Sequence, residues 1–328
     1  MGTFGYHQKN IMRQHSRKVK AATSSHGRHV PAVTVAVSVL NEAANIRAWL
    51  DSVLAQAEDG FALEKILIIS DGSTDGTTEI VRSVKDARIE LRAYSERIGK
   101  SSRLNEIYQD LQSDILVQSD ADVVFDHSQV VRDIIQPLLN DPAVGMCGGR
   151  PLPVAGTTFI ERAVNCTAEV FDGFRASVRG GDNVFSVDGR ILAYRRALVK
   201  QIVVPADMIT NDAYTYFCAR TLGWEYRYVP TAVVRFRSPR TLNDQIRQNT
   251  RFVAGPSRMR RYFAPSLVDH EYHVPQTIYW RALIAQFVRH PFLCGYIFLV
   301  NRYCALRARL NEKRLTAVWD IATTTKNV

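Results

Sequence analysis

Short runs rich in β-branched residues alternate with segments of helical spacing over the first 120 residues. The strand-like runs are VTVAVSVL (33–40), KILIIS (65–70), IELRAY (89–94) and ILVQS (115–119). In the segments between them, apolar residues recur every three or four positions, as Ile46, Leu50 and Val53 do. Strands and helices in alternation predict parallel βαβ units. The sequence therefore predicts an α/β protein with a mainly parallel sheet flanked by helices.

The bulk composition sets bounds on this fold. With 328 residues and 46% apolar side chains, the chain can bury one large core or two modest ones. The first strand is not followed by GxGxxG, so the usual dinucleotide-binding turn is missing. The five cysteines form no CxxC pair and no signal peptide opens the chain. We therefore expect neither disulfides nor zinc, and a reducing compartment.

The net charge of +10 is concentrated in two flanking segments. Residues 1–30 carry six Lys or Arg and no acidic residue, and residues 281–314 carry seven against the single Glu312. The rest of the chain is close to neutral. Basic flanks attract anionic lipid headgroups or nucleic acid. A solubilising tail and a solvated helix face are the alternatives.

The last seventy residues are aromatic, apolar and basic together. Their longest uncharged stretch, Pro291 to Asn301, is far shorter than the ~20 residues that a membrane-spanning helix needs. This segment has apolar residues at helical spacing and arginines among them, which favours a helix lying in a membrane interface. The residues are Phe292, Tyr296, Val300, Tyr303, Arg289, Arg302, Arg307 and Arg309. A core helix packed on the catalytic domain is the alternative.

Two carboxylates, Asp120 and Asp122, come directly after the apolar run ILVQS. Ligands of open α/β sheets bind outside the carboxyl ends of the strands. Mg²⁺ is typically held there by one or two carboxylates together with substrate phosphates. This placement therefore indicates a metal and nucleotide site, although an isolated Asp-x-Asp is also compatible with a solvated turn or a helix cap.

Further segments fall in the order and at about the spacing found in family 2 glycosyltransferases. They are SVLNEAANIRAWLDSVLAQ, ISDGSTDGT, ERIGKSSRLN, the Asp-x-Asp and ITNDAYTYFCARTLGWEYRYVPTAVVRFRSPRTLNDQIRQNTRF. The chain resembles this family from about residue 33 to 255, in particular the cellulose, hyaluronan and poly-N-acetylglucosamine synthase branch. The resemblance implies the GT-A fold, a nucleotide-sugar donor and a divalent metal, Mg²⁺ or Mn²⁺. A weaker match places Trp319 and residues 323–326 in the tail found after the membrane segments of these synthases.

The resemblance assigns the donor side of the site. It implies that Asp122 binds the metal and that Asp120 contacts the ribose or the metal. Asn41, Glu42 and Asp71 end strands where the nucleoside would sit, and Lys100 and Arg103 are expected to approach the diphosphate. An Asx turn at Asp71 and an exposed helix lysine at Lys100 are the alternatives. Ser70 replaces the first of two acids usual in the family, which weakens the case for uracil.

The resemblance also assigns the acceptor side. Asp212 lies where the family has a TED-type motif and is expected to be the general base, with a helix N-cap as the alternative role. Asn211 replaces the usual glutamate before it. Gln248, Arg251 and Phe252 reproduce QxxRW with Phe for Trp, which keeps the stacking face and loses the indole N–H. Were Asp212 not the base, Asp188 or Asp182 would be the next candidates.

The sequence thus predicts a metal-dependent inverting glycosyltransferase that transfers a sugar, most often UDP-linked, to a saccharide or lipid-linked acceptor. We expect a basic, flexible tail over 1–30, a GT-A catalytic domain over 31–255, and a membrane-associating segment with amphipathic interfacial helices over 256–328. The expected location is the cytoplasmic face of a membrane with an anionic surface, as a peripheral or monotopic protein. The alternatives are a polyprenyl-phosphate monoglycosyltransferase, an inactive scaffold and a basic nucleic-acid-binding protein. The paired carboxylates argue against nucleic acid, because they repel phosphate without a metal.

Overall fold

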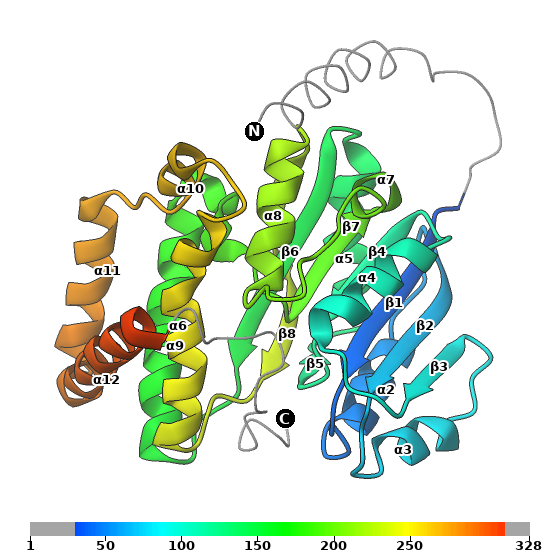
Figure 1. Ribbon diagram of the computed structural model, residues 1–328, viewed down its shortest axis with the longest axis horizontal. Helices are drawn as coiled ribbons and strands as arrows, with labels where there is room; N and C mark the ends of the chain where they lie inside the picture. The colour runs from blue at the N-terminus through cyan, green and yellow to red at the C-terminus, as the bar shows by residue number, and fades with distance from the viewer. Residues whose placement is uncertain (1–29, 312–328) are drawn as a thin grey trace. The chain divides into compact units, whose positions relative to one another are not determined.

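A computed structural model describes residues 30–311 of the chain (Figure 1). The described residues from Pro31 onward belong to one compact unit. The basic tail up to residue 29 and the match at Trp319 and 323–326 lie outside the described residues. So do the side chains of residues 309–311, Arg309 among them.

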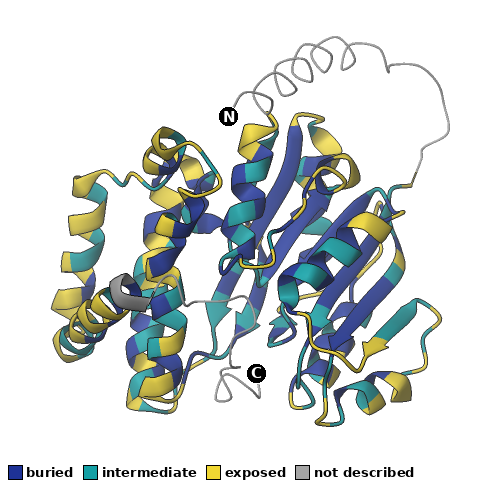
Figure 2. Cartoon of the chain, viewed as in Figure 1, coloured by how far each residue is buried: buried dark blue, intermediate teal, exposed yellow. Residues whose placement is uncertain are grey.

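The first half of the chain alternates strands and helices as the sequence predicts. The elements are β1 (Ala32–Val39), α2 (Ile46–Leu54), β2 (Ala62–Asp71), α3 (Thr77–Ser83), β3 (Ile89–Tyr94), α4 (Lys100–Asp110) and β4 (Ile115–Ser119). Strands β1, β2 and β4 are apolar on both faces because helices cover both sides of the sheet, as is usual for parallel strands. Figure 2 shows these strands as the buried centre of the fold.

The second half is less regular. Its strands are β5 (Val123–Phe125), β6 (Val144–Pro153), β7 (Ile191–Arg195) and β8 (Glu225–Phe236). Its helices are α5 (Val130–Asn140), α6 (Phe159–Ser177), α7 (Arg196–Val199), α8 (Asn211–Thr221), α9 (Leu242–Met259), α10 (Pro265–Glu271), α11 (Gln276–Arg289) and α12 (Pro291–Asn311). Two 3₁₀ turns, η1 (Arg179–Gly181) and η2 (Val184–Ser186), precede β7.

All eight strands form one sheet in the order β3-β2-β1-β4-β7-β6-β8-β5. The pairs β1/β2, β2/β3, β1/β4 and β6/β8 are parallel, and β4/β7, β6/β7 and β5/β8 are antiparallel. The predicted mainly parallel sheet flanked by helices is confirmed. The reversal of β7 matters for the site: Ile191, the first residue of β7, pairs with Ser119, the last residue of β4.

Two hydrophobic clusters cover the two faces of the sheet. One packs α2 and α5 against the strands, with Trp49 fully buried and its indole N–H donated to Ser119 Oγ at 2.7 Å. The other packs α4, α8 and α10, with Tyr108 and Tyr216 fully buried. Trp49 therefore holds Ser119, the last residue of β4, immediately before Asp120.

The C-terminal helices pack against one another and against α6. Helix α9 runs without a break through residue 255, where the sequence suggested a boundary, and α12 contacts both α9 and α6. The predicted apolar stripe on α12 is split. Val300 is buried and Tyr296 donates its hydroxyl to Gln245, because this side of α12 packs inward, whereas Phe292 is 86% exposed. No helix among residues 30–311 is long and apolar enough to cross a membrane.

Candidate active site

The carboxyl end of β4 and the amino end of β7 meet at one edge of the sheet. Asp120 and Asp122 follow β4, and the loop Asp188–Arg190 leads into β7. The first turn of α8 brings Asp212 to the same place, since the Gly189 amide donates a hydrogen bond to Asp212 Oδ2 at 3.3 Å. The antiparallel pairing of β4 with β7 is thus what joins these three segments.

Asp120 and Asp122 differ in their surroundings. Asp120 forms an ion pair with Lys100 at the start of α4. Burial and the charge of Asp120 raise the pKa of Asp122, while Arg190 and Lys100 act in the opposite direction. Burial would lower the pKa of Lys100, but the charge and hydrogen bond of Asp120 raise it. The two predicted metal ligands and the predicted diphosphate lysine therefore lie together.

Asp212 occupies the first turn of α8 without capping it. The helix begins at Asn211 and its N-cap is Thr210, so the N-cap role considered for Asp212 is not the one observed. Its Oδ1 accepts from the amide of Ala213 at 2.8 Å. Burial and the nearby charge of Asp188 raise the pKa of Asp212. A carboxylate of raised pKa is a better proton acceptor, which suits a general base.

Asn211, which stands where the family has an acid, points away from this cluster. Its Oδ1 accepts from Ser101 Oγ at 3.1 Å, and the side chain is buried between α8 and α4. The departure at Asn211 therefore serves contact between two helices.

Asp71 and Arg103 form a buried clamp at the end of β2. The Asp71 carboxylate accepts from the amides of Ile98 and Gly99 at 2.9 and 2.8 Å, and from Arg103 Nε at 2.8 Å. The remaining Arg103 nitrogens donate to Glu106 and to the Glu96 carbonyl. These bonds engage all three nitrogens of Arg103 with the protein and fix the loop before α4. Contact of either residue with a nucleotide remains a prediction.

Asn41 and Glu42 lie at the end of β1, as predicted. Asn41 has a left-handed backbone with φ of 55°, and its Oδ1 accepts from the amide of Thr74 at 2.7 Å. Its own amide donates to Ser73 Oγ, which also accepts from Ser70. Ser70, the departure from the family's paired acids, thus ties the ends of β1 and β2 together. The nucleoside contacts of Asn41 and Glu42 stay a prediction.

The QxxRW-like residues lie in the middle of α9. Burial lowers the pKa of Arg251, which interacts electrostatically with Asp120 and Asp212. Gln248 is half-buried one turn before it, and Phe252 is 55% exposed. Arg251 therefore belongs to the carboxylate cluster, whereas the aromatic ring of Phe252 is exposed.

Two residues of the cluster were missed or undervalued by sequence reasoning. Asp188 had been considered only as a replacement for Asp212, and Arg190 not at all. Asp182, the other reserve base, lies elsewhere: it accepts from the Tyr228 amide and pairs with Arg227. The signal was available in Asp188-Gly189-Arg190 directly before the apolar run ILAY, a second strand flanked by charges.

Other nearby arginines are already paired within the protein. Arg258 is buried and bound to Asp207, Arg260 pairs with Asp269, and Arg247 pairs with Asp244. The Arg258 guanidinium is 1% exposed and joins α9 to the loop before α8.

The residues present fit a divalent ion that a donor phosphate helps to bind. Within residues 30–311, no group of three or more His, Cys, Asp or Glu is placed to hold a metal by itself. Asp120 and Asp122 supply two carboxylates, and Gly189 leaves open space beside Asp120 where a side chain would otherwise stand. Two carboxylates completed by phosphate oxygens are the usual ligands of Mg²⁺.

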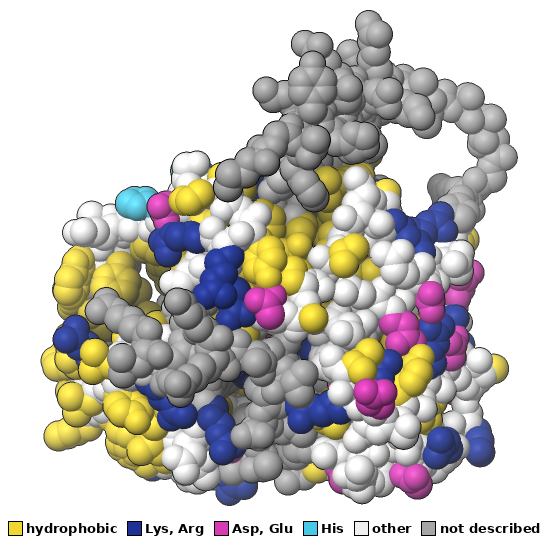
Figure 3. Space-filling model, viewed as in Figure 1, with side chains coloured by type: hydrophobic (Ala, Val, Ile, Leu, Met, Phe, Trp, Pro, Cys, Tyr) yellow, Lys and Arg dark blue, Asp and Glu magenta, His cyan; other side chains and the backbone are white. Residues whose placement is uncertain are grey.

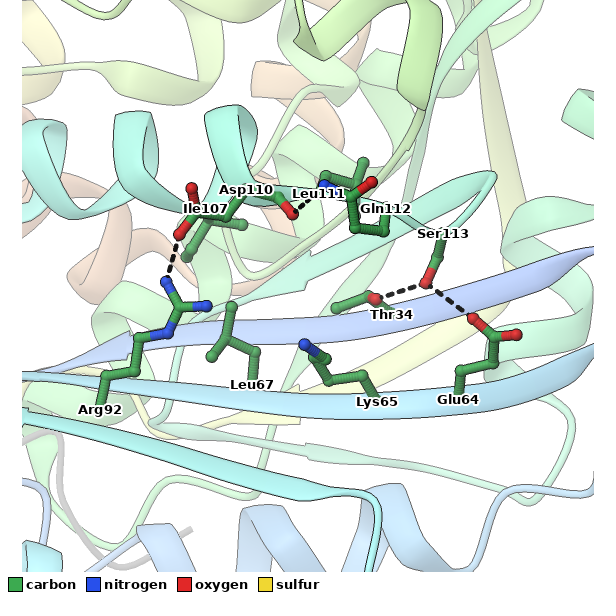
Figure 4. A pocket seen from close by; sticks show the side chains of 10 residues that line it. All are labelled: Thr34, Glu64, Lys65, Leu67, Arg92, Ile107, Asp110, Leu111, Gln112 and Ser113. Carbon is green, nitrogen blue, oxygen red and sulfur yellow. Dashed lines mark hydrogen bonds and ion pairs between the residues drawn. The ribbon is translucent and has the colours of Figure 1, made fainter.

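A separate cavity of about 80 Å³ lies at the other end of the strands, beside Thr34, Lys65 and the end of α4 (Figure 4). Its polar groups bind one another: Thr34 to Ser113, Ser113 to Glu64, and Arg92 to Asp110. It is too small for a nucleotide sugar, since ligand pockets measure about 300–1,000 Å³. This cavity is therefore not the predicted donor site.

Comparison with known proteins shows relatives in sequence and in fold. Poly-beta-1,6-N-acetyl-D-glucosamine synthases from Staphylococcus aureus and Staphylococcus epidermidis are 24% and 22% identical over 229 and 234 residues. The alignments cover 68% and 70% of this chain and 54% and 56% of the relatives, so the chain spans about half their length. A mannosyltransferase from Pyrobaculum calidifontis, solved with GDP-Man and Mn²⁺, shares the fold with a TM-score of 0.55 and 20% identity, over 97% of this chain and 85% of that one.

The family model for glycosyltransferase like family 2 matches residues 31–255. This range begins with β1, includes both Asp-x-Asp carboxylates and Asp212, and ends within α9 after Arg251. The chain therefore belongs to glycosyltransferase family 2 and has the GT-A fold.

Proposed function

We propose that the protein is a metal-dependent inverting glycosyltransferase that uses a nucleotide diphosphate sugar, UDP-linked by preference. The observation that carries this proposal is the placement of Asp212 across Gly189 from Asp120. It puts a carboxylate of raised pKa on one side of a gap and the predicted metal ligands on the other. A donor lying between them would have its anomeric carbon within reach of the base.

The residues support a single displacement. The bond between C1 of the sugar and the diphosphate oxygen breaks, and its electron pair leaves with the nucleoside diphosphate. An acceptor hydroxyl oxygen forms the new bond to C1, and its proton passes to Asp212. One attack from the opposite face inverts the configuration at C1.

The departing diphosphate gains negative charge, which the site is built to balance. Mg²⁺ or Mn²⁺, when bound by Asp120 and Asp122, would supply positive charge to the diphosphate. Lys100 and Arg251 lie in the same cluster and add fixed positive charge from the protein. Fixed charges in a buried site cost no reorganisation during the reaction.

We also propose peripheral attachment to an anionic membrane through α11 and α12, with a saccharide or lipid-linked acceptor at that surface. Figure 3 shows hydrophobic side chains gathered over these helices. The large exposed ones are Tyr279, Trp280, Ile284, Phe287, Val288, Phe292, Phe298, Leu299, Tyr303 and Leu306. The exposed Arg281, Arg289 and Arg302 lie among them, and each such cation near an anionic surface contributes about 1 kcal/mol.

Release of nucleoside diphosphate tests the catalytic proposal. UDP- and GDP-linked sugars are incubated with the protein and Mn²⁺, with saccharide or polyprenyl-phosphate acceptors in separate arms. We expect release with UDP-sugars that depends on an acceptor. Asp212→Asn removes the predicted base and is measured in the same assay. Asp182→Asn is its matched control, because Asp182 lies outside the cluster. No release with any donor by a folded protein contradicts the proposal and favours an inactive scaffold.

Sedimentation with liposomes tests the membrane proposal. Binding should strengthen with the fraction of anionic lipid, and Phe298→Ser with Leu299→Ser should weaken it without changing thermal unfolding. Equal sedimentation with and without liposomes removes this part of the proposal.

A further inference from the structure

Arg190 lies between the ends of the strands that carry the carboxylate pair. It directly precedes Ile191, which pairs with Ser119 next to Asp120. Its guanidinium carbon lies 3.8 Å from the centre of the Phe236 ring, and Phe236 pairs with Val123 next to Asp122. The guanidinium is therefore held close to both carboxylates by the sheet itself.

Two contacts fix the orientation of this guanidinium. Nη1 donates to both oxygens of Asp188 at 3.2 and 3.0 Å, and the ring of Phe236 covers one face. Nε and Nη2 make no hydrogen bond to any residue in the part of the chain that the structure describes, although the side chain is only 16% exposed. A fixed edge with N–H donors on both nitrogens matches two oxygens of one anion.

The charges around Arg190 bear on the charge of the ligand that this edge binds. The cluster holds four carboxylates, Asp120, Asp122, Asp188 and Asp212, and three cations, Lys100, Arg190 and Arg251. The protein contributes −1 in total, and a dication with a diphosphate of charge −2 leaves that sum unchanged. Without Arg190 the charge of the protein groups falls to −2. With Arg190 present, one more carboxylate on the ligand would also bring the total charge to −2.

We propose that Arg190 binds the diphosphate of the donor through Nε and Nη2 and stabilises it as it leaves, and that Asp188 is its positioning residue. This inference rests on the proposed function. When the C1–O bond breaks, the electron pair stays on a phosphate oxygen, and Nε and Nη2 of Arg190 would donate to the oxygens that gain charge. A planar fork binds two phosphate oxygens, whereas a lysine ammonium offers a point charge.

The test compares Arg190→Gln and Arg190→Lys with the wild-type protein and with Arg235→Gln. Arg235 is the matched control, since it lies beside Phe236 on β8 and pairs with Asp126 at the surface. Calorimetric titration with UDP and with GDP in Mn²⁺ measures diphosphate affinity, and turnover of the best donor gives kcat/KM. We expect Arg190→Gln to bind at least about 10-fold more weakly and to lose about 10²–10³-fold in kcat/KM. Arg190→Lys should recover only part of both, and Arg235→Gln should match wild type.

The outcomes separate this inference from the proposed function. If wild-type protein binds no nucleoside diphosphate, the proposed function fails. If wild type binds and both Arg190 variants bind equally well, the inference is wrong. A loss confined to donors whose sugar bears a carboxylate assigns Arg190 to the sugar and overturns the diphosphate assignment. A lower melting temperature with unchanged diphosphate affinity shows a structural role and also overturns it.

Asp188→Asn tests the positioning role. It should lower kcat more than it raises KM, because the guanidinium keeps its charge and loses its orientation. Equal kcat for Asp188→Asn and wild type would contradict that role.

Discussion

The amide of Gly189 donates to Asp212 Oδ2 at 3.3 Å, and the missing side chain of this glycine faces Oδ2 of Asp120. A Cβ at this position would lie 3.8 Å from Asp120 Oδ2 and 3.8 Å from Asp212 Cβ. One backbone position thus borders both a predicted metal ligand, Asp120, and the predicted base. We expect donor and acceptor to meet beside this position.

Gly189→Ala should therefore reduce activity and leave the fold intact. The added methyl group makes ordinary contacts and the backbone at Gly189 is not left-handed, so the melting temperature should change little. The methyl group narrows the gap between two reacting partners, and a misplacement of about 1 Å can cost about 10²-fold in rate. Measurement of kcat/KM and of thermal unfolding checks both parts.

Gly173→Ala is the control for that substitution. Gly173 lies inside α6 with open space around its Cβ position, so activity should equal that of wild type. Full activity of Gly189→Ala would show that the gap beside Gly189 is not used by substrate.

Asp122→Asn should abolish turnover that depends on Mn²⁺. The amide removes one of two anionic ligands, so the ion and the nucleotide sugar should both bind more weakly while the fold persists. Calorimetric titration with Mn²⁺, alone and with UDP, measures the loss. Full activity of the wild-type protein in excess EDTA would contradict a metal requirement.

The sequence was sufficient to predict the first half of the fold. The boundaries of β3 and β4 are those expected, because β3 alternates apolar and charged residues and β4 is a short apolar run that ends at polar residues. The second half was harder, since β6 contains Gly and Pro, β8 contains Pro, and the two pair across a long stretch of chain. Strand pairing of that kind depends on tertiary contacts, which local patterns do not encode.

The sequence was sufficient to predict the site residues that directly follow a strand. It was not sufficient for side chains whose contacts are to another, distant element. Asp120 and Asp122 follow β4 in sequence, so their neighbourhood could be inferred. Arg190 joins them only through the antiparallel pairing of β7 with β4, which spacing along the chain does not reveal. Arg103 matched a family position, but its guanidinium is held by the buried Asp71 clamp.

Asp212→Asn should lower kcat by about 10²- to 10⁴-fold and leave donor affinity almost unchanged. The amide cannot take the acceptor proton, while the predicted metal ligands are unaltered. It is similar in shape, and its single oxygen can keep one of the two backbone contacts, from the Gly189 amide or from the Ala213 amide. Comparison with Asp122→Asn separates the two roles, because that variant should lose donor affinity first. Near wild-type transfer by Asp212→Asn would move the base assignment to Asp188.

Glu161 should make the protein more stable above pH 4.5 than below it. Burial acts to raise its pKa, but hydrogen bonds from Thr157 and Thr158 and the ion pair with Arg237 lower the pKa of Glu161 to about 2 from 4.5. Because the folded pKa is the lower one, the stabilisation is present above pH 4.5 and is lost between about 4.5 and 2. Glu161→Gln should lower the free energy of unfolding at pH 7 by about 1–3 kcal/mol.

Chemical denaturation as a function of pH measures this effect. Glu79→Gln is the control, because Glu79 also lies in the first turn of a helix but its side chain is 69% exposed. Parallel stability curves for wild type and Glu161→Gln between pH 5 and 2 would show that Glu161 does not titrate with folding.

The fall in kcat at low pH, the acid limb of the pH–rate profile, should report the protonation of Asp212. Burial and the charge of Asp188 raise the pKa of Asp212, and a base works only when ionised. The rate kcat is therefore full above the raised pKa and falls as the pH drops through it. Asp188→Asn removes the like charge, so the pKa of Asp212 should fall and the acid limb should move to lower pH. Saturating Mn²⁺ keeps Asp120 and Asp122 ionised during the measurement, and Asp182→Asn, outside the cluster, serves as the control. A limb that stays in place in Asp188→Asn while kcat falls would mean that another group sets the pH dependence.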